Sequence, residues 1–470
     1  MYHIFVKDAM NYDMPPGVMH SINLTFGPGI LSTPLASPQH RKQRKMLNPA
    51  FSIAHMRGLL PLFYQVVDKL EGSIAKKVSN GPQEVDMLNW MGRTAFELIG
   101  QSGLGVSLDA LEDEETAHPL TQTLKELLLL SAHLSFETIY ILPLVANLGP
   151  AGLRRLVSRF IPNKNFQLLR KLSYDLWQQC IEIYEQKRRA LAMGDGAIKE
   201  LVGNGKDIMS ILSDYQQRSS ACFNDSCVLR LVRENTKASE EDRLDETEVL
   251  GQSALSRTLY MLASRKDVQS KLRKELKEAF HNGDISYDEL VSLPYLDAVC
   301  RETLRLHPPV TRLDRTALRD TMLPLSQPIT GQDGTIISQI VVPKGTTICV
   351  SFLNSNRNPA LWGEDAHEWK PERWLSPLPS TVLEESVPGV YSHLMTFSGG
   401  QRACIGFKFS QLEMKVVLAR LVRAFKFSLS EKEIAWDNAP VTSPTVSDSN
   451  KHDDGHPNPT MPLIVSLAEN

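Results

Sequence analysis

The sequence predicts a mainly α protein with a smaller β-rich part. Apolar residues recur at intervals of three and four from Ile53 to about Arg188, which is the spacing of amphipathic helices. Strand-like segments bounded by proline and glycine appear only after Val310. The 470 residues contain no long linker and no low-complexity tract, so nothing in the chain marks a boundary between domains.

The composition is that of an ordinary globular protein and excludes several classes. It is 42% hydrophobic and 22% charged with a formal net charge of −3, so no basic surplus points to nucleic acid as a partner. The six scattered cysteines include no Cys-x-x-Cys pair, which argues against a disulfide framework and favours a reducing compartment. The start of the chain has no signal peptide and no apolar run of spanning length, so we expect no transmembrane anchor in the chain as written.

The first functional candidates lie in a predicted helix at residues 40–49. His40 and Arg44 are separated by just over one helical turn, so both side chains can face a shared partner. A basic, solvated helix face explains the same spacing, so the pattern alone leaves both interpretations open.

Two later helices are predicted at residues 267–280 and 295–307. In the second, Glu302 and Arg305 share a helix face and can pair. The pattern Glu-x-x-Arg is weak alone, because Glu185–Arg188 and Glu240–Arg243 match it and a solvated face explains them. The helix-ending His307-Pro308-Pro309 distinguishes the pair at 302 and 305.

Strands follow the second of these helices. Residues 310–317 have the composition of a strand. We expect residues 340–342 and 348–352 to form a hairpin, because Pro343-Lys344-Gly345 between them has turn chemistry. A meander rich in proline and serine is expected at residues 376–397.

One cysteine near the end of the chain lies in a glycine-rich turn before an apolar, helix-compatible run. A helix N-terminus favours the thiolate of Cys404, and Arg402 can meet a carboxylate through two hydrogen bonds. Glycines such as Gly400 let a backbone approach a flat ligand, since they lack Cβ. These properties suit a haem iron bound axially through sulfur, whereas a buried structural cysteine is the alternative.

The segment Phe-x-x-Gly-x-Arg-x-Cys-x-Gly at residues 397–406 resembles the haem-binding signature of cytochromes P450. The resemblance extends from His40 to Val465, and it implies the P450 fold as a single catalytic domain over residues 1–470. It further implies haem b as cofactor, with Cys404 as the axial ligand of the iron and as the catalytic residue. The implied cofactor-binding residues are Phe397, Gly400, Arg402, Cys404, Gly406, His40, Arg44 and Arg315.

The same resemblance assigns two further groups of residues. Glu302, Arg305 and Arg373 match the family's Glu–Arg–Arg triad, which holds the loop before the cysteine and needs all three partners. Segments of the β-rich part are expected to border the substrate cavity, namely Thr311, Arg312, Leu313, Val441 and Thr442.

The implied function is that of a fungal microsomal monooxygenase active in secondary metabolism or xenobiotic oxidation. Such an enzyme inserts one oxygen atom from dioxygen into a small hydrophobic substrate, with electrons from NADPH through NADPH-cytochrome P450 reductase. The resemblance places it at the cytosolic face of the endoplasmic reticulum membrane, although the chain as written is also compatible with a soluble, cytoplasmic protein. Basic residues of the helix after Cys404 suit docking of an acidic electron donor or a solvated face: Lys408, Lys415, Arg420 and Arg423.

The sequence departs from the family pattern in two places. Residues 213–229 form an atypical insertion, and the centre of the long distal helix, with its Ala/Gly-Gly-x-Asp/Glu-Thr-Thr motif, is missing near residues 252–253. By comparison with the family, the resemblance also implies that the N-terminal anchor region is truncated. Two alternatives follow: a catalytically inactive or haem-poor chain, and a haem-thiolate isomerase or peroxygenase that needs no dioxygen activation.

Overall fold

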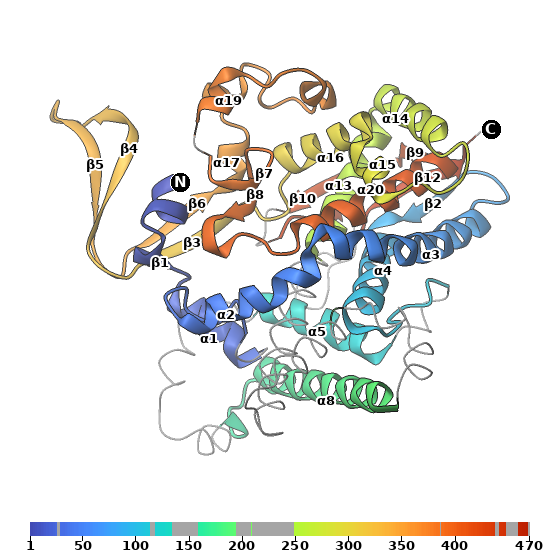
Figure 1. Cartoon of the computed structure of the whole chain (residues 1–470), viewed down its shortest axis with the longest axis horizontal. Coiled ribbons are helices and arrows are strands. Elements are labelled where there is room, and N and C mark those ends of the chain that lie inside the picture. Colours follow the sequence, from blue (N-terminus) through green and yellow to red (C-terminus); the bar gives the residue numbers. More distant parts are fainter. Residues whose placement is uncertain are drawn as a thin grey trace.

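The structure is a computed structural model that describes residues 1–25, 29–112, 118–133, 158–193, 208, 249–385, 387–437, 441–447 and 459–468. Helices form the body of the molecule, while the β1–β3–β6 and β2–β12–β9 sheets lie toward opposite ends of it (Figure 1). The predicted class, mainly α with a smaller β-rich part, is confirmed. The predicted insertion at residues 213–229 lies outside the described residues.

The helices of the first half follow the apolar spacing of the sequence. Ser37 and Asp86 begin two of them as N-caps, with side-chain oxygens accepting from the first turn. The bounds are α1 (Pro16–Thr25), α2 (Pro38–Leu47), α3 (Ile53–Lys77), α4 (Met87–Ile99), α5 (Pro119–His133) and α8 (Lys164–Met193).

The helices of the second half enclose the main hydrophobic core. Phe63 of α3 packs edge-on against Phe409, with ring centroids 5.1 Å apart, and so joins the two halves of the chain. The long helices are α13 (Val249–Ser264), α14 (Lys266–Ala279), α16 (Pro294–Leu306) and α20 (Phe407–Ala424). Shorter ones are α15 (Tyr287–Ser292), α17 (Phe352–Asn356), α18 (Pro359–Trp362) and α19 (Ser380–Glu384).

The strands form small antiparallel sheets. One joins β1 (Tyr12–Asp13), β3 (Arg312–Ala317) and β6 (Thr347–Ser351), and another joins β2 (Gln83–Asp86), β12 (Pro462–Leu467) and β9 (Phe425–Leu429). Three pairs complete the set: β4 (Thr321–Thr330) with β5 (Ile336–Val342), β7 (Gly389–Tyr391) with β8 (Leu394–Gly399), and β10 (Ile434–Asp437) with β11 (Ser443–Val446).

The predicted hairpin between residues 340–342 and 348–352 is wrong. β5 pairs with the preceding β4, and β6 pairs with β3 instead. Gly345 does turn the chain, at φ 86°, but its amide donates to the carbonyl oxygen of Ala317 and so directs β6 into the other sheet. The true hairpin turn contains Gly334, at φ 81°, and the β4–β5 hairpin projects from the body of the molecule (Figure 1).

The helix that contains the expected gap begins at Val249 in the described part of the chain. α13 continues without interruption through Gln252 and Ser253, and the residues immediately before it are outside the described range. Within the described residues, no helix combines the length and apolarity that a membrane crossing requires.

Candidate active site

Cys404 lies in the connection between β8 and α20. β8 ends at Gly399, a single 3-10 turn covers Gly400–Arg402, and the amide of Cys404 donates to the carbonyl oxygen of Phe397 at 2.9 Å. Ser398 and Gly400 adopt positive φ of 58° and 67°, so the chain reverses sharply there. The half-buried thiol therefore lies just before the N-terminus of α20, where the helix dipole favours the thiolate.

The glycines and the phenylalanine of this loop make close contacts. A Cβ at Gly400 would lie 1.8 Å from the carbonyl oxygen of Phe5, so the close approach at this glycine is made by the N-terminal turn His3–Lys7. Phe397 packs between Tyr391 and Phe407, with ring centroids 5.7 and 6.3 Å away. Another loop glycine, Gly406, is the N-cap of α20.

Arg402 joins the cysteine loop to the N-terminal segment. Its Nη2 pairs with Oδ1 of Asp13 at 2.7 Å and donates to the carbonyl oxygen of Thr33 at 2.8 Å. Its Nε is buried without a hydrogen-bond partner among the described residues. The sequence analysis missed Asp13, because no local spacing relates a strand near the N-terminus to a loop near the C-terminus.

Arg44 and His40 approach the same loop from α2. Arg44 Nη1 donates to the carbonyl oxygen of Ala403 at 2.8 Å. Burial lowers the pKa of Arg44, and the neighbouring Cys404 thiol opposes that shift. His40 is buried, and desolvation together with Arg402 and Arg44 lowers its pKa to about 4, so it is neutral at neutral pH. The guanidinium of Arg44 beside this thiol favours its anionic form.

Arg315 lies in the β1–β3–β6 sheet. It is buried, its Nη1 donates to the carbonyl oxygen of Asp314 at 2.9 Å, and its guanidinium lies 5.1 Å from the ring centroid of Phe5. Because Phe5 also contacts Gly400, the connection between Arg315 and the cysteine loop runs through that residue.

The structure brings Glu302, Arg305 and Arg373 together. Glu302 accepts from Nη2 and Nε of Arg305 at 2.8 and 2.9 Å and from Nε of Arg373 at 3.5 Å. Arg373 also pairs with Asp365 at 2.7 Å, a partner that the sequence analysis missed. The side chains of Glu302 and Arg305 are fully buried, so each charge depends on the others for compensation.

This charge cluster is connected to the strand that precedes Cys404. Arg305 Nη1 donates to the carbonyl oxygen of Asn356 at 3.0 Å. The side chain of Asn356 in turn accepts from the amide of Met395 at 2.9 Å and donates to Thr396 Oγ1 at 2.8 Å. The cluster therefore holds β8, which ends five residues before the cysteine.

Comparison with known proteins agrees with this geometry. The family model described as Cytochrome P450 matches residues 1–446. Cytochrome P450 monooxygenase 91 of Postia placenta is 47% identical over 99% of this chain and 83% of its own length. Ganoderic acid synthetase CYP5150L8 of Ganoderma lucidum is 43% identical over 95% of this chain and 81% of its own.

The chain belongs to the cytochrome P450 family. A crystal structure of a cytochrome P450 (CYP102L1) has the same fold, with a TM-score of 0.73 and 20% identity over 99% of this chain and 91% of the other. Cytochromes P450 are haem-thiolate monooxygenases, that is, oxidoreductases that incorporate oxygen from dioxygen. As a class they use protoporphyrin IX haem and a redox partner.

The donor set around Cys404 fits the haem of a P450. The set combines a half-buried thiol, the guanidiniums of Arg44 and Arg402, and the buried, neutral imidazole of His40. An orphaned N–H, that of Arg402 Nε, remains buried there for a further acceptor such as a carboxylate.

The residues predicted to border the P450 substrate cavity lie in two neighbouring segments. Thr311 and Leu313 are half-buried, whereas Arg312 is exposed at the start of β3. The amide of Thr442 donates to the carbonyl oxygen of Pro309 at 2.9 Å, which joins the segment of Val441 and Thr442 to the end of α16.

The basic residues of α20 differ in how available they are to a redox partner. Lys415 is buried and pairs with Asp297 at 2.7 Å, and Arg420 pairs with Asp68 and Asp284 at 3.0 and 2.5 Å. These two are held by carboxylates within the protein, whereas the half-buried Lys408 and Arg423 lie over the rings of Phe407 and Phe280.

Proposed function

We propose that this chain is a haem-thiolate monooxygenase that oxidises a small hydrophobic substrate, with Cys404 as the axial ligand of iron. The observation that carries the proposal is the position of Cys404 before α20, beside Arg44 and Arg402. Electrons come from NADPH through a separate cytochrome P450 reductase. The relative named ganoderic acid synthetase supports a small organic substrate rather than a macromolecule.

The residues around Cys404 have different roles in binding the cofactor. Arg44, Arg402 and Arg315, with His40, supply donors for the carboxylate groups of haem, and Arg44 also keeps the sulfur of Cys404 anionic. When bound, haem b supplies the activation of dioxygen. The Glu302–Arg305–Arg373 cluster has a structural role, since it fixes β8 through Asn356.

The surroundings of the site complete the proposal. Residues 1–470 act as one catalytic domain, and residues 311–313 and 441–442 border the substrate. Like microsomal members of the family, the protein works at the cytosolic face of the endoplasmic reticulum. Its identity to fungal P450 monooxygenases over almost the whole chain supports this assignment.

A carbonyl spectrum of the reduced, haem-reconstituted protein tests the proposal. We expect the red-shifted band of a thiolate-ligated carbonyl, and we expect Cys404→Ser to lose it. Cys349→Ser, at an exposed thiol on β6, is the matched control and should keep the band. Equal haem uptake and an equal spectrum in Cys404→Ser would refute the ligand assignment. A protein that takes up no haem would support an inactive chain, and turnover with peroxide but not with NADPH and reductase would support an isomerase or peroxygenase.

A further inference from the structure

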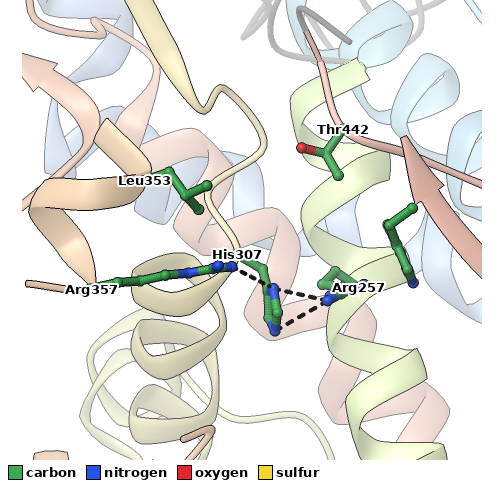
Figure 2. Close-up of a pocket in the computed structure, with 6 residues that line it drawn as sticks. Arg257, His307, Leu353, Arg357 and Thr442 are labelled. Atoms are coloured by element: carbon green, nitrogen blue, oxygen red, sulfur yellow. Dashed lines mark hydrogen bonds between the residues drawn. The ribbon is translucent and has the colours of Figure 1, made fainter. Parts of the chain in front are cut away.

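A second site lies at the C-terminal end of α16, where this helix meets α13, α17 and the segment between β10 and β11. A cavity of about 240 Å³ opens there (Figure 2). A cavity of this size has room for a carboxylate group and the first carbons attached to it. The lining residues are Arg257, His307, Leu353, Arg357, Trp436 and Thr442.

The charged wall of the cavity consists of two arginines that share one histidine. Arg257 Nη2 and Arg357 Nη2 lie 2.9 and 3.2 Å from Nδ1 of His307 (Figure 2). Burial, together with these guanidiniums, lowers the pKa of His307 to about 2. The imidazole is therefore neutral at neutral pH and accepts from both cations, so this wall carries two positive charges.

No carboxylate compensates these charges in the part of the chain that the structure describes. Arg357 Nε donates to a carbonyl oxygen, that of Leu306, at 2.6 Å. Nε and Nη1 of Arg257 are buried without a hydrogen-bond partner among the described residues, as are Trp436 Nε1 and Thr442 Oγ1. Buried N–H and O–H groups without acceptors are destabilising, and two half-buried cations lie beside them, so an acceptor with negative charge complements this wall.

The remaining surfaces favour an organic ligand over an inorganic one. The guanidinium of Arg257 lies 4.1 Å from the ring centroid of Trp436, which holds it in place, and Leu353 adds an apolar surface. The amide of Leu353 donates to Thr311, and that of Thr442 donates to Pro309. The cavity thus adjoins the segments proposed to border the substrate.

We propose that this cavity binds the carboxylate group of an organic acid, with Arg257 as its main anchor. The carboxylate accepts from Nε or Nη1 of Arg257, which lie on different edges of the guanidinium, with Trp436 Nε1 and Thr442 Oγ1 as further donors. The acid is either the substrate, whose hydrocarbon part extends toward residues 309–311, or a small free carboxylate. In naming an amphipathic acid as the substrate class, the inference rests on the proposed function.

Isothermal titration of the full-length chain with decanoate, methyl decanoate and acetate tests this proposal without requiring turnover. We expect decanoate to bind at least about tenfold more tightly than its uncharged ester, and we expect Arg257→Gln to lose at least about tenfold of that affinity. Thr442→Val leaves both guanidiniums in place and should lose about threefold. Arg319→Gln, at an exposed arginine outside the cavity, should bind like wild type. Circular dichroism confirms that each variant is folded.

The outcomes separate the alternatives. Tight decanoate binding that depends on Arg257, with weak acetate binding, supports an amphipathic acid, and equal binding of acetate supports a small free carboxylate. Equal binding of acid and ester, or affinities unchanged in Arg257→Gln, would show that the cavity does not recognise a carboxylate and would overturn the inference. A chain that binds decanoate through Arg257 but gives no carbonyl band refutes only the proposed function, and the reverse result refutes only the carboxylate site.

Discussion

Two arginine clusters lie near the C-terminal end of α16, and they differ in how their charges are compensated. Arg305 donates to both oxygens of Glu302 and to the carbonyl oxygens of Asn356, Ala366 and Glu368. Arg257, by contrast, donates a hydrogen bond to His307, and two of its nitrogens are buried without a partner among the described residues. In the first cluster, protein groups accept the hydrogen bonds of Arg305. In the second cluster, hydrogen-bond donors of Arg257 have no acceptor among the described residues.

This difference separates a structural arginine from one available to a ligand. A buried ion pair with every donor and acceptor satisfied fixes the chain around it, and breaking it strands a charge. A buried cation without an anion lowers the stability of the fold, and such a cost is typical of residues that bind a ligand. The predictions below test this distinction from the largest expected effect to the smallest.

The largest effect should follow from removing the central anion of the complete cluster. We expect Glu302→Gln to lower the free energy of unfolding by about 3–5 kcal/mol, because Arg305 and Arg373 are left without their shared carboxylate. Chemical denaturation monitored by circular dichroism measures this loss. The matched control is Glu372→Gln, at a partly exposed ion pair with Lys271, which should cost less than about 1 kcal/mol. Equal effects of the two substitutions would show that the cluster is not a structural unit.

The two clusters also show what the sequence could and could not reveal. Glu302 and Arg305 are three residues apart on one helix, so local spacing was enough to predict that they pair. Arg257 lies on α13 and Arg357 directly follows α17, and both bind His307, so no spacing rule relates them. The same limit explains why the pairing of β6 with β3 was missed, since local turn chemistry does not determine the sheet that a strand joins.

The cysteine loop shows the same division between local and long-range information. The spacing of Arg402 and Cys404 is local, so it could be recognised in the sequence. It remains the basis of the proposed haem site. The ion pair of Arg402 with Asp13 joins the two ends of the chain, so only the fold reveals it. A motif in the sequence is therefore enough to propose roles for Arg402 and Cys404. The groups that form hydrogen bonds and ion pairs with such side chains cannot be predicted in this way, because they come from distant parts of the chain.

A buried ionisable group on α20, Glu413, extends the comparison to an acid. Both carboxylate oxygens of Glu413 are buried without a hydrogen-bond partner among the described residues, and burial raises its pKa from 4.5 to about 8. The folded state therefore binds this proton more tightly than the unfolded state does. Stability from this group is present below about pH 4.5 and is lost as the pH rises through about 8.

Replacing this acid by its neutral amide should remove that pH dependence. We expect Glu413→Gln to stabilise the protein above about pH 8, by an amount on the order of 2 kcal/mol, and to have little effect near pH 5. Thermal unfolding at both pH values measures the difference. Glu431→Gln, at an exposed position, is the control and should show no such dependence. A variant whose unfolding temperature falls in parallel with that of wild type as the pH rises would show that Glu413 is ionised in the fold.

The smallest effect on stability should follow from removing the uncompensated cation. Arg257→Met loses the hydrogen bond to His307 and the contact with Trp436, but it also removes a buried charge that has no carboxylate partner in the described structure. The lost contacts destabilise the fold, whereas removal of the uncompensated charge stabilises it. We therefore expect the free energy of unfolding to stay within about 1 kcal/mol of wild type. The same substitution in the complete cluster, Arg305→Met, should cost more than about 3 kcal/mol, because it strands Glu302. If the two variants are equally destabilised in chemical denaturation, Arg257 is as structural as Arg305, and its buried N–H groups are not held for a ligand.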